Sequence, residues 1–529
     1  MSAHLLALST AASAMLAAHD VGTNSQQRAG PSRTRRRAGL RLERAGAALD
    51  AAPAPAVVTA PPAEAAYAGI RLTDVIGSLS YALDMSEGQP VGHSVRTAMI
   101  GMRLATQVGL SEQDRSALFY ALLLKDLGSS SNAAQLSSHF GADDRALKAA
   151  RRLIDWTDRR DAARYALRHA GRDRSWLGRG WKVLAQMGRP GDAEREMAAV
   201  RAERGAAIAA MLAMSPATCE GIRAADEHWD GNGMPRALRG AAIPLIARIV
   251  GLAQTVEVFE QAFDIDTAFR IAHDRRGRWF DPELVDALDT FAGDAAFWSD
   301  LRHADALSAL RRCEPPDRVV YANELRLDTV AEAFAKVIDA KSPFTARHSQ
   351  NVSFLATRTA MELDMTNREV RALRRAALLH DVGKLGVGNR ILDKAEPLTP
   401  DEMAAMQRHT RFTLEILRGV PRFERFAVMA ASHHERLDGS GYHVGLAGDE
   451  LSLSARVLAV ADVCEALSAT RPYRGPLPVG AVMRQLEQGV ATGRLCAVAV
   501  EALTGWFEGL PSSPVHLTSG GDSTSLFGI

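Results

Sequence analysis

The two halves of the chain carry the same pattern of polar residues at the same spacing. His93 and Asp126 in the first half correspond to His348 and Asp381 in the second, and each partner lies 255 residues further along the sequence. Self-similarity at a fixed interval indicates that one structural unit is present twice. The 529 residues are therefore expected to build the same domain fold in two copies, here called the first copy and the second copy.

Both copies are predicted to be helical. The first copy shows apolar residues at helical spacing at Leu72, Val75, Ile76, Leu79 and Leu83. The second copy shows the same pattern at Val330, Phe334, Val337 and Ile338. Such a stripe is the face by which a helix packs on a core. The sequence therefore predicts an all-α fold made of tandem duplicated helical domains.

Composition indicates where the copies begin and end. The Arg-rich and Ala/Pro-rich start of the chain and its Ser/Gly-rich end are typical of disorder, and the Pro-Pro pair that follows Cys313 is typical of a linker. The predicted organisation is a disordered tail (1–66), the first copy (67–312), a linker (313–322), the second copy (323–510) and a disordered tail (511–529).

Within the first copy, an Arg-rich insertion covers about residues 129–190 and includes Arg151, Arg152, Arg159 and Arg160. It is expected to form a solvated helical hairpin, and contact with an anionic partner is the alternative.

The second copy concentrates histidine and aspartate on successive predicted helices. An apolar helical run ends in the adjacent pair His380-Asp381, which aims two side chains at one point. A neutral imidazole donates a lone pair to a transition metal, and a carboxylate can bridge two metals. The candidate ligands are His348, His380, Asp381, His409, His433, His434 and Asp462. Because the set contains no cysteine, it favours Mn or Fe, with Zn as the other metal that fits.

The second copy resembles the HD superfamily of metal-dependent phosphohydrolases and, specifically, the HD-GYP family. The motifs that carry the resemblance are HDVGK from His380, HHERLDGSGY from His433, the aspartate in AVADV, and the segment from Arg471 to Arg474. They occur in the order typical of that family, over about residues 325–475. The resemblance implies an HD-type helical fold and hydrolysis of cyclic di-GMP to the linear dinucleotide pGpG, with further cleavage to GMP left open.

The same resemblance implies roles for single residues. His348, His380, Asp381 and Asp462 would hold one divalent metal ion, and Asp381, His409, His433 and His434 a second, so that Asp381 bridges a dinuclear Fe or Mn centre. Lys384 follows His380 by four residues and, if the helix continues, lies on the ligand face, where it would act on the phosphate or the leaving group. Arg471 and Arg474 match basic positions that hold substrate phosphate. Ordinary surface lysine and arginines are the alternative.

Two positions differ from the HD-GYP pattern. Some members carry a glutamate ligand for a third metal four residues before His348, but Phe344 stands there and offers no lone pair. A dinuclear centre is therefore expected, and with it a reaction that stops largely at pGpG. His443 replaces the proline that follows the GYP tyrosine, and an exposed loop histidine is a better interpretation of it than an added ligand.

The first copy lacks most of the ligand set. At the positions that match His380, His409, His433, His434 and Asp462 it has Lys125, Glu203, Ala225, Asp226 and Gln254. A lysine places a cation where a metal would lie, so the first copy is predicted to be a metal-free, degenerate HD-type domain with a regulatory or dimerising role.

The composition limits the other functions that the chain can have. Its 63 basic and 62 acidic residues nearly cancel, which disfavours DNA binding through a general basic field. It has no apolar stretch of about 18 residues that would span a membrane. Its four scattered cysteines are typical of a cytoplasmic protein.

Several alternatives remain open at this point. One is a phosphohydrolase acting on another nucleotide. Another is a non-catalytic scaffold or regulator that responds to a cyclic dinucleotide. A homodimer, and a signalling protein bound at the GYP-like loop, are the candidate protein partners.

Overall fold

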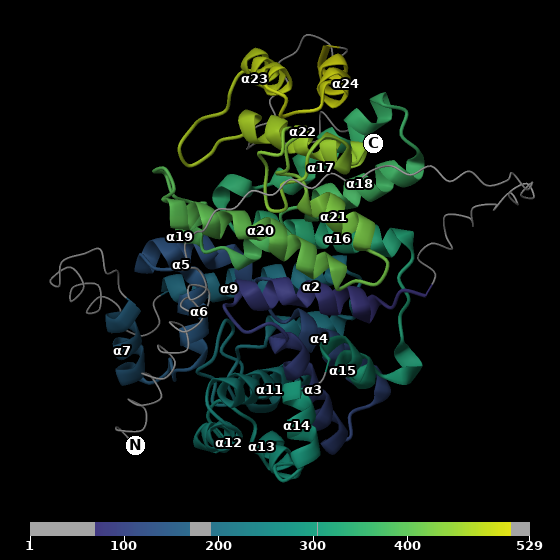
Figure 1. Ribbon diagram of the computed structural model, residues 1–529. Coiled ribbons are helices and arrows are strands. Elements are labelled where there is room, and N and C mark those ends of the chain that lie inside the picture. The colour runs from purple at the N-terminus through teal and green to yellow at the C-terminus, as the bar shows by residue number, and fades with distance from the viewer. Residues whose placement is uncertain (1–68, 170–191, 304, 509–529) are drawn as a thin grey trace, which may run out of the picture. The chain divides into compact units, whose positions relative to one another are not determined.

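The computed structural model describes residues 69–169, 192–303 and 305–508 (Figure 1). Within these ranges the regular structure consists of α-helices and short 3-10 helices, with three isolated β-bridges and no strand. This confirms the predicted all-α fold. The predicted disordered tails lie outside the described residues, and so does the end of the Arg-rich insertion from residue 170 onwards.

The described helices of the first copy lie before and after the undescribed part of the insertion. They are α2 (Leu72–Ser86), α3 (His93–Gln107), α4 (Glu112–Leu124), η2 (Ser129–Asn132), α5 (Ala133–Phe140), α6 (Asp144–Arg152), α7 (Arg159–His169), α9 (Asp192–Met211), α10 (Pro216–Arg223), η3 (Gly240–Ala242), α11 (Leu245–Ala262), α12 (Ile265–Asp274), α13 (Pro282–Asp289), α14 (Ala295–His303) and α15 (Ala306–Cys313). The 3-10 helix η4 (Pro316–Arg318) follows.

The second copy repeats this order as far as α13, without the insertion and with two short helices added. Its elements are α16 (Glu324–Asp339), η5 (Pro343–Thr345), α17 (His348–Glu362), α18 (Asn367–Leu379), η6 (Val382–Gly386), α19 (Asn389–Leu392), α20 (Pro400–Arg418), α21 (Glu424–Ala431), η7 (Gly448–Glu450), α22 (Leu453–Ser468), α23 (Val479–Ala491) and α24 (Ala497–Glu508). Helices α3 and α4 begin and end 255 residues before α17 and α18, respectively. Helix α10 begins and ends 208 residues before α21. The duplication is thus present in the helices themselves.

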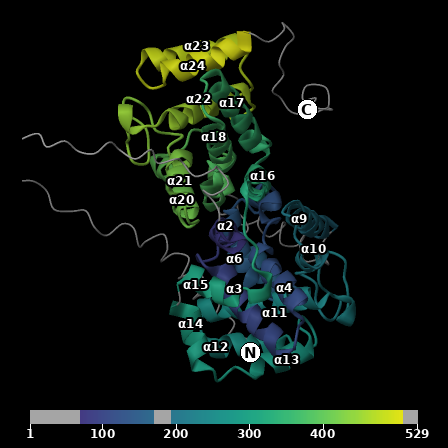
Figure 2. The same ribbon diagram turned by 90° about the vertical axis from the view of Figure 1, so that its right-hand side faces the viewer.

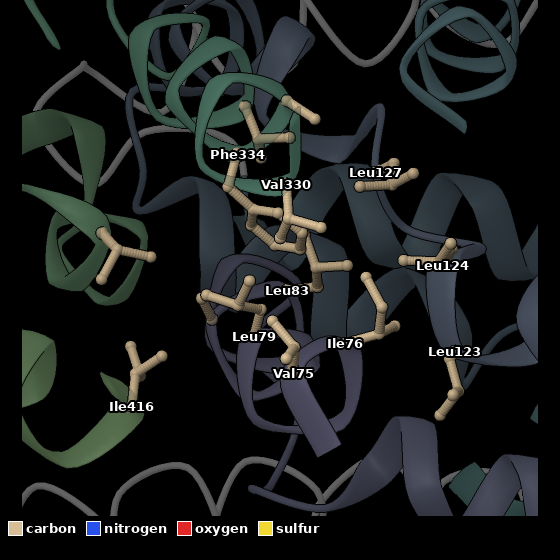
Figure 3. Packing of buried hydrophobic residues seen from close by; sticks show 14 of the residues in the cluster. Val75, Ile76, Leu79, Leu83, Leu123, Leu124, Leu127, Val330, Phe334 and Ile416 are labelled. Atoms are coloured by element: carbon tan, nitrogen blue, oxygen red, sulfur yellow. The ribbon is translucent and has the colours of Figure 1, made fainter. Parts of the chain in front are cut away.

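A single cluster of buried apolar side chains runs through both copies. Figure 3 shows its centre, where Val75 and Leu79 of α2 lie near Val330 and Phe334 of α16. Helix α2 buries nearly every residue because it packs on helices of its own copy and also on η6 and α20 of the second copy. Figure 2 shows α17 beside α18 and α22, the three helices that carry several of the candidate ligands.

The predicted linker is bound to the start of the first copy. The amide of Leu72 donates to the carbonyl of Val320 at 2.7 Å, and the amide of Ala322 donates to Ile70 at 2.9 Å. Contacts group residues 67–529 into one compact unit, so the division at 313–322 stays a prediction. Among the described helices, none has the length and apolar character needed to cross a bilayer.

The expectation of a solvated insertion is wrong for α6. Arg152, at its end, is only 19% exposed and makes ion pairs with Glu87 and Asp126 at 3.1 and 3.2 Å. Lys148 donates to the carbonyl of Ser129 at 2.9 Å. Helix α6 is therefore part of the folded first copy, whereas Arg159 at the start of α7 is exposed, as expected.

Candidate metal centre

Helix α18 fixes the position of the His-Asp pair. A capping box between Thr366 and Glu369 begins the helix, and its apolar face, including Leu373 and Ala377, is buried. The helix ends at Leu379, and His380 is its C-terminal cap. Both ligand side chains therefore emerge at the end of a buried helix, as the sequence predicts.

The continuation of that helix through Lys384 is not observed. After Asp381 the chain tightens into the 3-10 helix η6, because the Lys384 amide donates to the Asp381 carbonyl at 2.9 Å. This tighter turn brings Lys384 Nζ to 2.5 Å from Asp381 Oδ2. Lys384 thus lies beside the candidate ligands, although by a local geometry different from the expected one.

The close approach of η6 to α20 depends on a glycine. A Cβ atom added to Gly383 would lie 2.0 Å from the carbonyl oxygen of His409 and 2.8 Å from the amide nitrogen of Thr413. Only a residue without a side chain fits there. The contact places His409, in the middle of α20, against the loop that carries Asp381.

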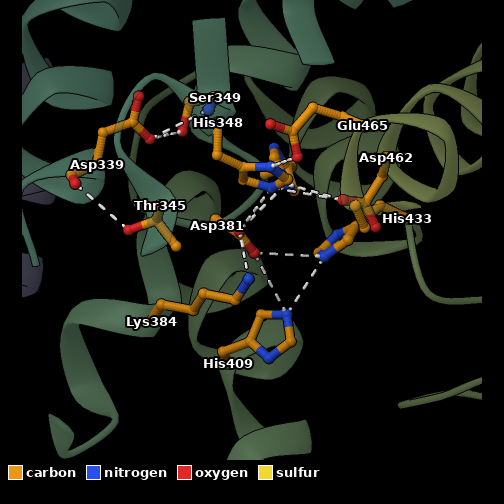
Figure 4. Close-up of polar contacts among 12 residues, drawn as sticks. Asp339, Thr345, His348, Ser349, Asp381, Lys384, His409, His433, Asp462 and Glu465 are labelled. Atoms are coloured by element: carbon orange, nitrogen blue, oxygen red, sulfur yellow. Dashed lines mark hydrogen bonds and ion pairs between the residues drawn. The ribbon is translucent and has the colours of Figure 1, made fainter. Parts of the chain in front are cut away.

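The remaining candidates come from two further elements. His433 and His434 lie in the turn directly after α21, and Asp462 lies within α22. The seven candidates are brought to one place, and all are buried except His434, whose side chain is 21% exposed. Figure 4 shows five of them: His348, Asp381, His409, His433 and Asp462.

The imidazole nitrogens converge on Asp381. The Nε2 atoms of His348 and His380 are 3.2 Å apart, and each lies 3.3 Å from Asp381 Oδ2. The Nε2 atoms of His409 and His433 are also 3.2 Å apart, and each lies 3.6 Å from Asp381 Oδ1. One carboxylate thus faces two pairs of imidazoles, one pair on each oxygen.

The other ring nitrogen of each histidine already has an acceptor. Nδ1 of His380, His409 and His433 each contacts a carbonyl oxygen three residues earlier at 2.7 Å, and Nδ1 of His348 contacts Glu465 at 2.5 Å. If each Nδ1 carries the proton that it donates, neutral rings direct lone pairs from Nε2 toward one another. Such an arrangement repels unless a cation lies between the nitrogens.

Asp381 supports the same conclusion, because its Oδ1 is buried and has no hydrogen-bond donor. An orphaned carboxylate oxygen facing two imidazole lone pairs is costly in a protein interior and is satisfied by a metal ion. The residues present therefore fit divalent metal. Three groups have ligand atoms within 4.8 Å of one another: His348, His380 and Asp462; His380, Asp381 and His433; and His409, His433 and His434.

Burial and charge keep most candidates in the form that binds metal. Burial lowers the pKa of His409 to about 3 and that of His434 well below its usual value, so both rings stay neutral. Burial raises the pKa of Asp381, but His380 and Lys384 outweigh it and hold the pKa well below the usual value. His348 differs, because Glu465 and Asp381 overcome its burial and raise its pKa to about 10.

Glu465 is a site residue that the motif comparison did not single out. It lies one helical turn after Asp462 on α22, so helical spacing alone places it on the same face. Its contact with His348 orients the ligand ring, and Arg471 Nη2 donates to Glu465 Oε2 at 3.0 Å. A carboxylate behind a metal-binding histidine commonly fixes its orientation.

The two arginines predicted to hold phosphate differ in their surroundings. Arg471 contacts Glu465, as described, and is half-buried. Arg474 donates to the carbonyls of Ala466, Leu467 and Gly475 at 2.8–2.9 Å, and so covers the end of α22. Phosphate binding by either arginine stays a prediction. Phe344 supplies no ligand atom, and His443 is in none of the three groups.

In the first copy an ion-pair network occupies the corresponding place. Lys125 Nζ lies 2.8 Å from Asp126 Oδ2, and Asp126 and Asp226 both contact Arg152. His93 is retained and contacts Glu257, the counterpart of Glu465. None of the three candidate metal groups among the described residues includes a residue of the first copy, and its metal-free state stays a prediction.

Comparisons with known proteins agree with the geometry. The HD domain family matches residues 181–284 and 332–495, and so matches part of each copy. A 3'3'-cGAMP-specific phosphodiesterase of Vibrio cholerae is 38% identical over 421 residues, which cover 80% of this chain and 91% of that protein. A cyclic di-GMP phosphodiesterase of Thermotoga maritima is 41% identical over 145 residues, or 27% of this chain and 39% of that protein.

A solved structure extends the similarity to the fold. The crystal structure of a cyclic GMP-AMP specific phosphodiesterase of V. cholerae is 35% identical, covers 84% of this chain and 99% of its own, and has a TM-score of 0.59. The sequence-based resemblance is therefore confirmed. The chain belongs to the HD domain family of metal-dependent phosphohydrolases, in its HD-GYP branch.

Proposed function

We propose that the second copy hydrolyses a phosphodiester bond of a cyclic dinucleotide. The observation that carries the proposal is the convergence of four imidazole Nε2 atoms on the two oxygens of Asp381. Two divalent ions held there would activate a water and neutralise charge on the phosphoryl oxygens. Relatives named as cyclic dinucleotide phosphodiesterases support this substrate class.

The protein's own residues would divide the work around that centre. His348, His380 and Asp462 would hold one ion and His409, His433 and His434 the other, with Asp381 between them. Lys384 Nζ lies beside the Asp381 carboxylate, where it would donate a proton to the leaving oxygen or a hydrogen bond to the phosphate. Glu465 would keep Nδ1 of His348 protonated, so that Nε2 faces the metal.

The motifs and the relatives point to different cyclic dinucleotides as the substrate. The sequence motifs predict cyclic di-GMP, whereas the relative that covers 80% of the chain is named for 3'3'-cGAMP. Phe344 in place of a third-metal ligand favours a reaction that stops at the linear dinucleotide. A homodimer, a protein partner at the GYP-like loop and a cytoplasmic location stay predictions.

The test is turnover by anaerobically purified protein loaded with Fe or Mn. Cyclic di-GMP and 3'3'-cGAMP are supplied separately, and products are separated by chromatography beside an Asp381→Ala control. We expect a linear dinucleotide from at least one substrate and no product from the control. Bound metal without turnover of either substrate would refute the proposal and favour another nucleotide substrate. No metal and no turnover would favour a non-catalytic regulator.

A further inference from the structure

The first copy contains a cavity of about 120 Å³ beside the ion-pair network that occupies the place of the metal centre. Ala225, Asp226 and Gln254, the counterparts of His433, His434 and Asp462, line it. We call this space the first-copy cavity and define it by Arg151, Arg152, Trp156, Arg201, His228 and Trp279. These three positions thus border the cavity, whereas Lys125 and Asp126, the counterparts of His380 and Asp381, do not line it.

One wall of the first-copy cavity is aromatic. The ring of His228 stacks on Trp279 with centroids 4.0 Å apart, and lies 4.8 Å from Trp156. His228 is buried, which lowers its pKa to about 4 and keeps the ring neutral. Its Nδ1 has no hydrogen-bond partner within the described part of the chain. The wall therefore offers apolar ring surface together with one unsatisfied polar atom, a combination suited to a heteroaromatic ligand.

Guanidinium groups also line the first-copy cavity. Arg152 and Arg201 both form ion pairs with Asp226, so this carboxylate already has two cationic partners. Arg151 lies over the ring of Trp156 at 5.4 Å and makes no ion pair with any described residue. Arg248 uses Nη1 on Asp281, but its Nε is buried and without a partner within the described ranges. Arg151 and the Nε group of Arg248 thus remain for an anion, although Glu194 and Glu227 also line the cavity.

The size of the first-copy cavity limits the ligand. A cavity of about 150 Å³ holds a single benzene ring, so 120 Å³ encloses no more than one ring, and the two bases of a cyclic dinucleotide cannot both enter it. We propose that the first-copy cavity binds a nucleoside monophosphate. Its base lies against Trp156, His228 and Trp279, and its ribose and phosphate lie outside the enclosed space, at the partly exposed side chains of Arg151 and Arg201.

Helix α6 connects the first-copy cavity to the metal centre of the second copy. Arg151 and Arg152 form its last turn, at the cavity. At its first turn, Asp144 accepts from the Asn389 amide and from Lys341 Nζ, both at 2.9 Å. Arg145 Nη1 donates to the Gly386 carbonyl at 2.7 Å, at the end of the loop that carries Lys384. A ligand that moves Arg151 thus acts on a short rigid helix whose other end holds that loop.

Binding is tested by titration calorimetry on the full chain carrying Asp381→Ala, which disables the metal centre. The probes are GMP and AMP, with guanosine lacking the phosphate and benzoate lacking the nucleoside. We expect GMP or AMP to bind, and guanosine to bind at least about tenfold more weakly because the phosphate contacts are lost. Absence of binding by both nucleotides, or binding by benzoate alone, would overturn the proposal.

Matched variants place the ligand in the first-copy cavity. Arg151→Gln removes a lining cation, and Arg159→Gln removes an exposed arginine of the same insertion. Ala198→Phe fills the cavity, and Val200→Phe adds the same bulk at a position on α9 that is 46% exposed. We expect about tenfold weaker nucleotide binding in the first variant of each pair only. Equal affinity in all four variants would refute the assignment.

The connection through α6 is tested by amide hydrogen exchange, which does not depend on catalysis. GMP is expected to change the exchange of residues 382–392 in the Asp381→Ala chain. In an added Arg145→Ala variant, nucleotide binding should persist and that change should disappear. An unchanged exchange pattern with nucleotide bound, or a change that survives Arg145→Ala, would overturn the role of α6.

Discussion

Replacement of Gly383 by alanine should damage the metal centre through packing alone. The added Cβ would lie 2.0 Å from the His409 carbonyl oxygen, whereas real Cβ contacts essentially never fall below 3.0 Å. Helix α20 and η6 must therefore separate by about 1 Å. Metal–ligand distances tolerate only about 0.2 Å, so His409 would leave its ligand position.

The first copy provides a matched control for this prediction. Gly128 occupies the corresponding position, and its added Cβ would lie 1.9 Å from the Arg201 carbonyl oxygen. Arg201 is therefore the counterpart of His409, and the predicted match with Glu203 is wrong by two residues. Overpacking of this kind lowers the free energy of unfolding by about 1–3 kcal/mol in either variant. Only Gly383→Ala, however, should also lower metal affinity.

The assay combines chemical denaturation with metal titration in competition with a chelator. We expect Gly128→Ala to be destabilised but to bind metal as the wild type does. Gly383→Ala should be destabilised by a similar amount and should bind metal at least about tenfold more weakly. Wild-type metal affinity in Gly383→Ala, or an equal loss in Gly128→Ala, would refute the reasoning.

Three further predictions concern single side chains. Glu465→Gln should weaken metal binding by about 10–100-fold, because His348 loses its orienting carboxylate, and unchanged affinity in chelator competition would contradict this. Burial lowers the pKa of His228 to about 4 in the folded protein, against about 6.5 in the unfolded chain. The unfolded chain therefore takes up a proton first as the pH falls. Between pH 7 and pH 4.5 the wild type should lose about 2.5 kcal/mol more of its free energy of unfolding than His228→Gln. Denaturation of both proteins at each pH measures this, and equal losses would contradict it. Thr366→Ala removes the cap of α18 and should lower the free energy of unfolding by about 1 kcal/mol. Chemical denaturation measures this, and an unchanged denaturation midpoint would contradict it.

The sequence was sufficient to predict the helical duplication and the residues that converge on the metal centre. Helical periodicity and fixed spacing report on packing that is repeated along the chain, which is why α3 and α17 have matching bounds. The His-Asp pair could be located because the apolar run before it must be buried.

Features that arise from contacts between distant segments could not be predicted from helical periodicity or spacing. The 3-10 turn that brings Lys384 to Asp381 forms where η6 packs on α20, and helical spacing gave no sign of it. The position of α6 depends on carboxylates of the first copy and on backbone groups of the second copy, so an Arg-rich segment that appeared solvated is folded. Glu465, by contrast, could have been found from its helical spacing to Asp462.

The most direct test of the central claim is the metal content of the intact chain. Anaerobically purified protein is analysed for Fe and Mn beside Asp381→Ala and the first-copy counterpart Asp126→Ala. We expect two metal ions per chain in the wild type and in Asp126→Ala, and fewer than one in Asp381→Ala. Metal retained in folded Asp381→Ala, or lost in folded Asp126→Ala, would contradict a dinuclear centre confined to the second copy.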